Sequence, residues 1–195
     1  MRCRHCGCTD DRACPGGCWW VAPEACSSCV GGSLSAVISP CGLYRYRLDR
    51  SIQLSGNVTA YFGVNPSTAD AVAEDQTTRK WRGFSLRNDC RRYIVGNLFA
   101  LRSTDVRGLA AAEDPIGPAN DQYLEQIIAE ADVLVPCWGS AGKVPARLRP
   151  RLEHMKQLLA SSGKPVRIFG LTKSGDPLHP LTLAYRTPLQ SWSCR

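Results

Sequence analysis

The sequence of 195 residues lacks the patterns of several large protein classes. No apolar run approaches the ~20 residues of a membrane span. The amino-terminal residues are polar and rich in cysteine, unlike the basic and then apolar start of a secretory signal peptide. G-x-G-x-x-G, G-x-x-x-x-G-K-[ST] and G-x-S-x-G are also absent, which argues against dinucleotide-binding, P-loop and α/β-hydrolase sites. We therefore expect a cytoplasmic protein of another class.

The chain is moderately basic: it has 24 Lys and Arg residues and 17 Asp and Glu residues, which gives a net charge of +7. A basic bias of this kind favours a polyanionic partner through counterion release, so nucleic acid, and DNA in particular, is the expected partner. The alternative is an arginine-rich soluble surface without such a partner.

Cysteine is abundant and unevenly placed, with seven of the 11 cysteines in the first 29 residues. The outermost four are Cys3, Cys6, Cys26 and Cys29, which form two C-x2-C pairs. Two such pairs can direct four thiolates onto one ion in the tetrahedral geometry of structural zinc. The sequence therefore predicts a zinc-binding module at residues 1–29 with these four ligands.

Three further cysteines, Cys8, Cys14 and Cys18, lie between the two pairs. They can complete a second metal site or replace members of the outer four. An iron–sulfur cluster is one alternative, because four thiolates also hold such clusters. Disulfides are another, since dense cysteines mark small secreted domains, but the odd number and the missing secretory signal favour a metal.

The rest of the chain is typical of one α/β domain at residues 43–195, joined to the module by a Gly- and Ser-rich linker at residues 30–42. Short apolar runs of strand length alternate with stretches of helical spacing, and a further strand or hairpin opens the domain. This alternation predicts a mostly parallel sheet of four or more strands flanked by helices. The predicted strands are residues 58–64, 93–99, 133–138 and 166–171, and the predicted helices are residues 76–90, 121–131 and 145–161.

Each of the four predicted strands ends in a cluster of small or polar residues. Ligands of open parallel sheets bind outside the carboxyl ends of the strands, so we expect the clusters to form one pocket. The candidate ligand-binding residues are Pro66, Ser67, Thr68, Asn97, Arg102, Asp105, Gly139, Thr172 and Lys173.

Three residues of these loops are candidates for catalysis. Asn65 can orient a water molecule or a ligand amide, and Asp70 can act as a general base. His179 lies in a short loop with a proline on either side, which would hold its backbone stiff, and only three histidines occur in the chain. The plainer alternatives are a turn residue for Asn65 and a helix-capping carboxylate for Asp70.

Four segments resemble a bacterial and phage family, the domain-of-unknown-function family 1643. They are residues 64–70, 97–105, 113–121 and 170–181. The resemblance extends over about residues 43–192 and implies no established activity. The cysteine-rich module is similar to modules attached to various phage-encoded proteins, so the resemblance implies a phage or prophage origin and the host cytoplasm as location.

A second resemblance is to the uracil-DNA glycosylase superfamily. Gly63-Val64-Asn65-Pro66 is similar to the loop that holds the catalytic water after the first strand, although Ser67 stands where Gly is usual. His179-Pro180 is similar to a terminal loop that contacts the base. The resemblance implies a uracil-DNA-glycosylase-like fold and an N-glycosylase-like hydrolase that acts on a modified or non-standard base.

In that interpretation Asn65, together with Asp70, positions water at the sugar C1′. His179 then stabilises the departing base of a nucleotide extruded from the stack. Two alternatives stay open. One is a non-catalytic DNA- or protein-binding phage factor that counters a host system, and the other is an enzyme acting on free modified nucleotides.

Overall fold

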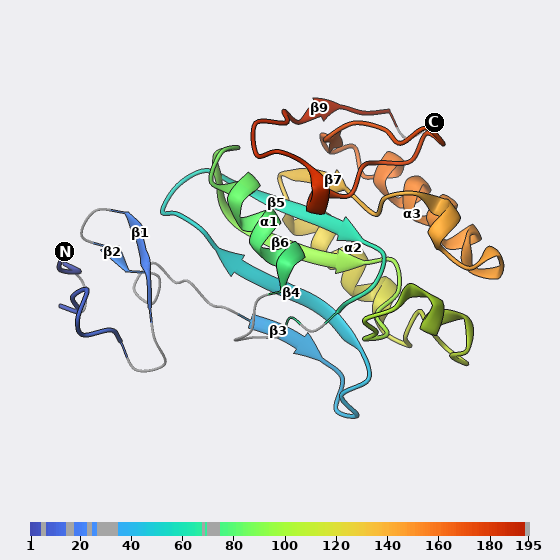
Figure 1. Cartoon of the computed structure of the whole chain (residues 1–195), viewed down its shortest axis with the longest axis horizontal. Coiled ribbons are helices and arrows are strands. Elements are labelled where there is room, and N and C mark those ends of the chain that lie inside the picture. The colour runs from blue at the N-terminus through green and yellow to red at the C-terminus, as the bar shows by residue number, and fades with distance from the viewer. Residues whose placement is uncertain are drawn as a thin grey trace.

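The computed structural model consists of a small cysteine-rich module and an α/β body (Figure 1). It describes residues 1–4, 7–14, 18–22, 25–26, 35–67, 69 and 75–193. In the module, β1 (Trp20–Ala22) pairs antiparallel with β2 (Ala25–Cys26). No helix in the described part of the chain is long and apolar enough to cross a membrane.

The body is built on a five-stranded mixed sheet with the order β3-β4-β6-β5-β7. Its strands are β3 (Ser35–Ile38), β4 (Arg45–Ser51), β5 (Asn57–Gly63), β6 (Cys90–Asn97) and β7 (Val133–Pro136). β5 pairs in parallel with both β6 and β7, whereas β4 pairs antiparallel with β3 and β6. The prediction of an α/β fold with a sheet of four or more strands is confirmed, but the sheet is mixed and not mostly parallel, because a β3–β4 hairpin extends the parallel strands on one side.

Two predicted segments differ in extent from the structure. The linker expected at residues 30–42 is interrupted by β3, which begins at Ser35 and pairs Ala36 with Leu48 of β4. The fourth predicted strand, residues 166–171, shortens to β8 (Arg167–Ile168). A parallel bridge between Leu134 and Val166 places β8 beside β7, and β8 also pairs antiparallel with β9 (Gln190–Ser191).

The three predicted helices are present with shifted ends. They are α1 (Gln76–Ser85), α2 (Asn120–Glu130) and α3 (Pro150–Ser161). Four short 3-10 helices lie in the connections: η1 (Val106–Ala110), η2 (Ala141–Lys143), η3 (Ala146–Leu148) and η4 (Pro180–Thr182). Asp75 begins α1, because its Oδ1 accepts a hydrogen bond from the backbone N–H of Thr78 at 2.8 Å.

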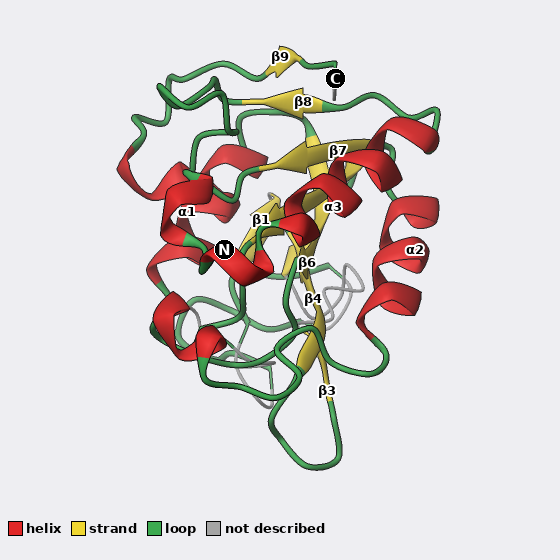
Figure 2. Cartoon of the chain, turned by 90° about the vertical axis from the view of Figure 1, so that its right-hand side faces the viewer, coloured by secondary structure: helices red, strands yellow, loops and turns green. Residues whose placement is uncertain are grey.

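The helices form a layer on each face of the sheet, with α1 on one face and α2 and α3 on the other (Figures 1 and 2). Alternation along β5 supplies both cores. Tyr61 packs with Trp81 and Phe84 of α1, whereas its neighbour Phe62 belongs to the cluster that contains Leu124 of α2. The sheet is thus buried on both faces, and its edges remain for function.

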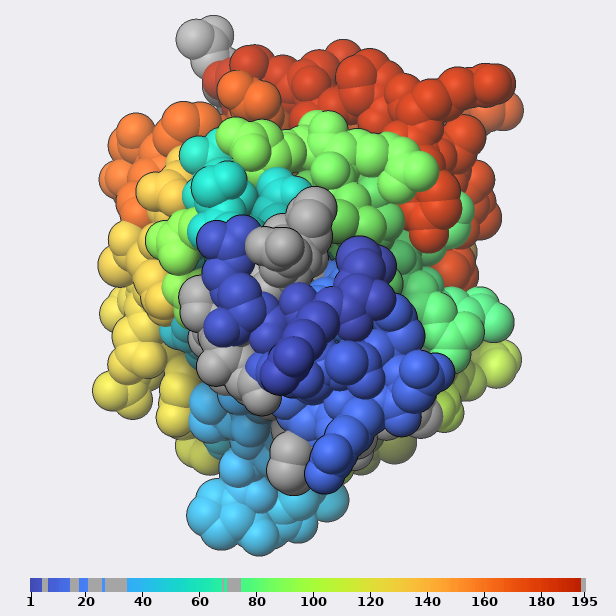
Figure 3. Space-filling view, turned by 90° about the vertical axis from the view of Figure 1, so that its left-hand side faces the viewer, coloured from blue at the N-terminus to red at the C-terminus, as the bar shows by residue number. Residues whose placement is uncertain are grey.

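The cysteine-rich module lies at the end of the body from which β5 and β6 start. The arrowheads of both strands point away from it in Figure 1, and Figure 3 shows the module covering that end of the molecule. Trp19 of the module contacts α1 there, with the Arg82 guanidinium 5.6 Å from the centre of its ring. The carboxyl ends of β5 and β6 are therefore at the opposite end from the cysteines.

Candidate functional site

One backbone and one side-chain hydrogen bond join the loops that follow β5 and β6. Ser103 donates its N–H to the carbonyl of Pro66 at 2.9 Å, and Asn65 donates Nδ2 to the carbonyl of Ser103 at 2.7 Å. The same Nδ2 contacts the carbonyl of Pro66 at 3.1 Å. Because both amide hydrogens are used within the protein, the Oδ1 of Asn65 is the atom left to accept a hydrogen bond from a ligand or water.

A second set of contacts joins the loops that follow β7 and β8. Gly139 donates its N–H to the carbonyl of Pro177 at 2.9 Å, and the buried Asp176 accepts the N–H of Ala141 at 2.9 Å. Gly139 has φ +78°, and a Cβ built on it would lie 3.2 Å from the Cβ of His179. The structure thus brings Gly139 and His179 together, and the hydrogen bond of Asp176 holds the two loops against each other.

His179 is half-buried and held in one tautomer. Its Nδ1 accepts the N–H of Leu181 at 3.3 Å, so the proton of the neutral ring is on Nε2. Burial lowers the pKa of His179, and the nearby charge of Lys143 lowers it further, against a smaller opposite effect of Asp75. At neutral pH this side chain is an uncharged donor through Nε2.

Asn97 ends β6 with a side chain that is almost completely buried. Its Oδ1 lies 3.0 Å from where a Cβ on Gly63 would stand, and the Trp81 ring lies 3.7 Å from the same point. Gly63 thus makes room for both side chains. Trp81 donates Nε1 to Cys137 Sγ at 3.3 Å, and burial raises the pKa of Cys137 to about 12. Cys137 is therefore a protonated core residue and not an ionised nucleophile.

Several predicted site residues have other roles or other positions. Asp105 is exposed, caps η1 by accepting the N–H of Arg107 at 2.9 Å, and pairs with the Arg107 side chain. Thr172 holds a tight turn by accepting the N–H of Asp176 at 3.1 Å, and Lys173 is exposed on that turn. Ser67 is half-buried beside Pro66. Thr68 and Asp70 lie outside the described residues.

One residue at this edge escaped the sequence analysis, namely Arg45 at the start of β4. Its side chain is buried at 2% exposure and donates Nη1 to the carbonyl of Ala69, in the loop that follows β5. Arg102, which sequence analysis did single out, donates Nη1 to the carbonyl of Gly42 at 3.2 Å. No local sequence signal marks it, because the burial of Arg45 depends on the pairing of β4 with its neighbouring strands.

The second candidate site is a cluster of cysteine sulfurs in the amino-terminal module. The sulfurs of Cys8, Cys14, Cys18 and Cys26 all lie within 4.8 Å of one another. Two of the separations are 3.7 Å, from Cys8 to Cys18, and 3.8 Å, from Cys14 to Cys26. Four sulfurs about 2.3 Å from one ion are about 3.8 Å apart in a tetrahedron, so the cluster can hold a metal ion.

Backbone N–H groups donate to one sulfur of this cluster and to that of the neighbouring Cys3. Cys14 donates its N–H to Cys18 Sγ at 3.3 Å, and Cys26 donates its N–H to the buried Cys3 Sγ at 3.4 Å. Such bonds stabilise thiolates over thiols. The separations are far longer than the S–S bond of about 2 Å, so neither the Cys8–Cys18 pair nor the Cys14–Cys26 pair is a disulfide.

The outer four cysteines cannot be compared as a set, because Cys6 and Cys29 lie outside the described residues. Of that set, only Cys26 belongs to the cluster of four sulfurs that the structure describes. The other three members are the cysteines between the two C-x2-C pairs. Spacing alone favoured the two C-x2-C pairs as the metal ligands. The structure instead brings the sulfurs of Cys8, Cys14 and Cys18 close to that of Cys26 in β2.

Comparison with known proteins gives one result for the body. A family model described as "Protein of unknown function (DUF1643)" matches residues 45–181. No curated protein and no solved structure was found to match the chain. The matched span includes β4 to β8 and all four strand-end loops, and it leaves out the cysteine-rich module. Since it covers well over half of the 195 residues, the chain belongs to the DUF1643 family.

Proposed function

We propose that the body is a nucleobase- or nucleotide-recognising enzyme of the DNA-glycosylase type that acts on a modified or non-standard base. The observation that carries the proposal is the pairwise joining of the loops after β5 and β6 and of those after β7 and β8. Asn65 and His179 belong to the two joined pairs. In a sheet with parallel central strands these loops leave at one edge, where a ligand can contact both pairs.

The two side chains suit the two halves of an N-glycosidic hydrolysis. Oδ1 of Asn65 is available to accept a hydrogen bond from water, and Nε2–H of His179 is available to donate one to the base. Water oxygen would form the new bond to the sugar C1′ while the C1′–N bond breaks and its electron pair leaves on the base. His179 would stabilise the negative charge that develops there.

The proton of the attacking water requires an acceptor. Asp70 stays the candidate general base from the sequence, and after release the same proton neutralises the base. Asp75 caps α1 and is held by Thr78, so it contributes charge near His179 but is already engaged. Because its pKa is lowered, His179 would act at neutral pH as a neutral hydrogen-bond donor and not as a cation.

The test is base release from duplexes that contain uracil, a mismatch or a modified base, detected as alkali-labile abasic sites. Asn65→Ala and His179→Ala should each lower the rate at least about 100-fold, the size of effect known for positioned hydrogen-bond donors in active sites. Matched controls are Asn57→Ala at the exposed start of β5 and His154→Ala on α3. Equal rates for His179→Ala and His154→Ala would remove His179 from the mechanism.

The pH dependence offers an independent check on His179. Because its folded pKa lies below 6.5, we expect base release to be constant above that pH and to fall as the ring is protonated at lower pH. Lys143→Ala removes a charge that lowers this pKa, so it should move the acidic limb towards higher pH. An unmoved limb would mean that another group titrates.

The same assays separate the alternatives. Retention on DNA without base release would support a non-catalytic phage factor that counters a host system. Turnover of mononucleotides in preference to duplexes would support an enzyme acting on free modified nucleotides. If DNA is the partner, affinity should fall steeply with salt because bound phosphates release counterions.

For the module we propose zinc as the metal held by Cys8, Cys14, Cys18 and Cys26. The all-cysteine donor set and the two sulfur separations near 3.8 Å support it, and the ion would fix the fold of a module too small to have a large core. Metal analysis of the whole chain should find zinc, and Cys14→Ser should lose it while the exposed Cys41→Ser retains it. Iron with acid-labile sulfide would indicate an iron–sulfur cluster instead.

A further inference from the structure

Arg45 is a buried cation without a carboxylate partner among the described residues. Its side chain makes one hydrogen bond, to the carbonyl of Ala69, and its Nε is buried without any partner. Arg151, buried to a similar degree at 7% exposure, behaves differently because it pairs with Asp121. Removing an unpaired charge from water has an unfavourable free energy, so a buried arginine of this kind suggests a function other than stabilising the fold.

The backbone aims Arg45 towards the site loop. Val37 of β3 pairs with Arg47 but the next residue, Ile38, pairs with Arg45, so Tyr46 is the extra residue of a β-bulge. A bulge breaks the alternation of side chains and redirects them. Arg47 therefore bonds with Glu130 of α2, on one face of the sheet, whereas Arg45 reaches Ala69 on the face of α1.

Arg102 lies beside Arg45 on the neighbouring strand end. Arg45 donates its N–H to the carbonyl of Ala100, and Arg102 donates its N–H to the carbonyl of Leu43, both at 2.9 Å. The Nε of Arg102 is also buried without a hydrogen-bond partner, and neither arginine forms an ion pair with a described residue. The two arginines thus lie on adjacent strand ends, where the chain leaves β6, and Arg45 reaches the loop that holds Asn65.

Burial lowers the pKa of Arg45 to about 10, with Arg50 and Arg102 adding to the effect and Asp75 opposing it. Arg45 therefore stays charged at neutral pH. A ligand with more than one negative charge would satisfy both guanidinium groups. The planar fork of arginine binds two oxygens of a phosphate at once.

We propose that Arg45 and Arg102 form the binding site for a phosphoryl group of the ligand, at the carboxyl edge of the sheet beside Asn65. This inference rests on the proposed function for the identity of the ligand as a nucleotide. The phosphoryl group can belong to a free nucleotide or to the backbone of DNA. The chemistry is the same, and the test separates the two sources.

The first experiment measures thermal unfolding of the whole chain with inorganic phosphate against chloride at matched ionic strength. Phosphate at about 100 times its dissociation constant should raise the melting temperature by at least about 3 °C. Arg45→Met and Arg102→Met should each abolish most of that rise. Arg47→Met is the matched control, since its cation is paired with Asp49 and Glu130. It should melt lower than wild type without phosphate and keep the full phosphate-induced rise.

A structural role for Arg45 predicts a different pattern. If Arg45 served only to hold Ala69, Arg45→Met would have a lower melting temperature without phosphate. It would still show the phosphate-induced rise in melting temperature. On our inference it melts no lower than wild type and loses the response. Arg102→Met keeps the test valid if Arg45→Met fails to fold, because Arg102 is only half-buried. A wild-type chain that phosphate does not stabilise would overturn the inference.

The second experiment compares a nucleoside 5′-monophosphate with a short DNA duplex. If the site takes the phosphate of a nucleotide, Arg45→Met should weaken mononucleotide binding at least about 10-fold and leave the salt dependence of duplex binding unchanged. If it takes a backbone phosphate, the slope of log affinity against log salt should fall by about one. A variant that changes neither quantity contradicts the inference.

The two proposals can fail separately. Base release without any phosphate-dependent stabilisation would leave the glycosylase-type mechanism and remove the phosphoryl site. If phosphate stabilises the chain through Arg45 but no base is released from any substrate tested, the phosphoryl site stands and the glycosylase-type mechanism is removed.

Discussion

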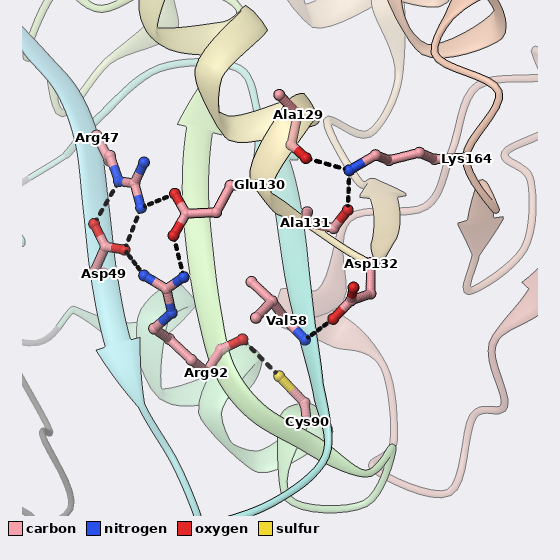
Figure 4. Close-up of polar contacts among 10 residues, drawn as sticks. All are labelled: Arg47, Asp49, Val58, Cys90, Arg92, Ala129, Glu130, Ala131, Asp132 and Lys164. Carbon is pink, nitrogen blue, oxygen red and sulfur yellow. Dashed lines mark hydrogen bonds and ion pairs between the residues drawn. The ribbon is translucent and has the colours of Figure 1, made fainter.

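The arginines of β4 and its neighbours differ sharply between the two ends of the sheet. Towards the start of β6, Arg47 and Arg92 are both paired with Asp49 and Glu130 in a closed ring of contacts (Figure 4). At the carboxyl end of β6, Arg45 and its neighbour Arg102 have no such partners among the described residues. The difference separates charges that serve the fold from the two that we propose bind a ligand.

The paired end shows what a structural arrangement looks like here. The carboxylate of Asp49 accepts from Arg47 at 2.7 Å and from Arg92 at 3.0 Å, and it is only 6% exposed. Nearby, Lys164 bonds with the carbonyls of Ala129 and Ala131 at the end of α2, where the helix dipole favours a cation (Figure 4). Every charge shown there has an opposite charge, carbonyl oxygens or, for Asp132, the backbone N–H of Val58, so no ligand is needed to satisfy it.

Asp49→Asn should give the largest effect, because it leaves two partly buried arginines without their shared carboxylate. We expect a loss of about 3 kcal/mol in the free energy of unfolding, measured by urea titration at pH 7. A substitution of the exposed Asp89, Asp89→Asn, should change it little. If Asp49→Asn were equally mild, the distinction between the two ends would lose its energetic basis.

Substituting the two arginines of β4 in parallel is the most direct way to sharpen the comparison. Arg47→Met should lower the free energy of unfolding by about 2 kcal/mol, since Asp49 and Glu130 would then have Arg92 as their one remaining ion-pair partner in this ring. Arg45→Met should be neutral or stabilising by about 1 kcal/mol, because it removes a cation that has no carboxylate. Equal losses from both substitutions in urea titrations would contradict the view that only one of them is paired for stability.

The outline of the body was accessible from the sequence because it depends on local patterns. Apolar runs such as residues 58–64 have the length of buried strands, and the residues around Trp81 have helical spacing. Antiparallel pairing of β4 with β6 was not accessible, since it joins segments more than 40 residues apart and no local signal gives strand direction. The bulge at Tyr46 and the burial of Arg45 depend on that pairing, so they were also missed.

The candidate sites show the same division. Loops that follow strands were predicted to meet, and contacts such as that of Asn65 with Ser103 join them in pairs. Which cysteines converge was not accessible, because C-x2-C spacing describes pairs along the chain and not the fold of the loop between them. Cys14 and Cys26 are 12 positions apart in sequence, yet their sulfurs are 3.8 Å apart.

Acid should weaken the paired end specifically. Burial works to raise the pKa of Glu130, but hydrogen bonds from Arg92 and Arg47 outweigh it and the net pKa is lowered from 4.5. A lowered folded pKa means that the stabilisation is present above pH 4.5 and is lost as the pH falls through the folded value. In urea titrations from pH 7 to pH 3, Glu130→Gln should therefore lose less stability on acidification than wild type. Parallel pH profiles for the two proteins would contradict the assignment.

The smallest effect is expected for Asp105, which the sequence placed in the pocket and the structure places in solvent. Arg107 donates to the Asp105 carboxylate through both its guanidinium group and its backbone N–H, and these contacts hold the pKa of Asp105 below its usual value. Exposed pairs contribute little because water screens them. Asp105→Ala should leave base release and phosphate-induced stabilisation unchanged, with no more than a slight decrease in melting temperature from the lost cap of η1. A large loss of base release, with the melting temperature unchanged, would mean that the loop turns Asp105 towards the ligand and that the carboxyl edge carries an acid beside its two unpaired arginines.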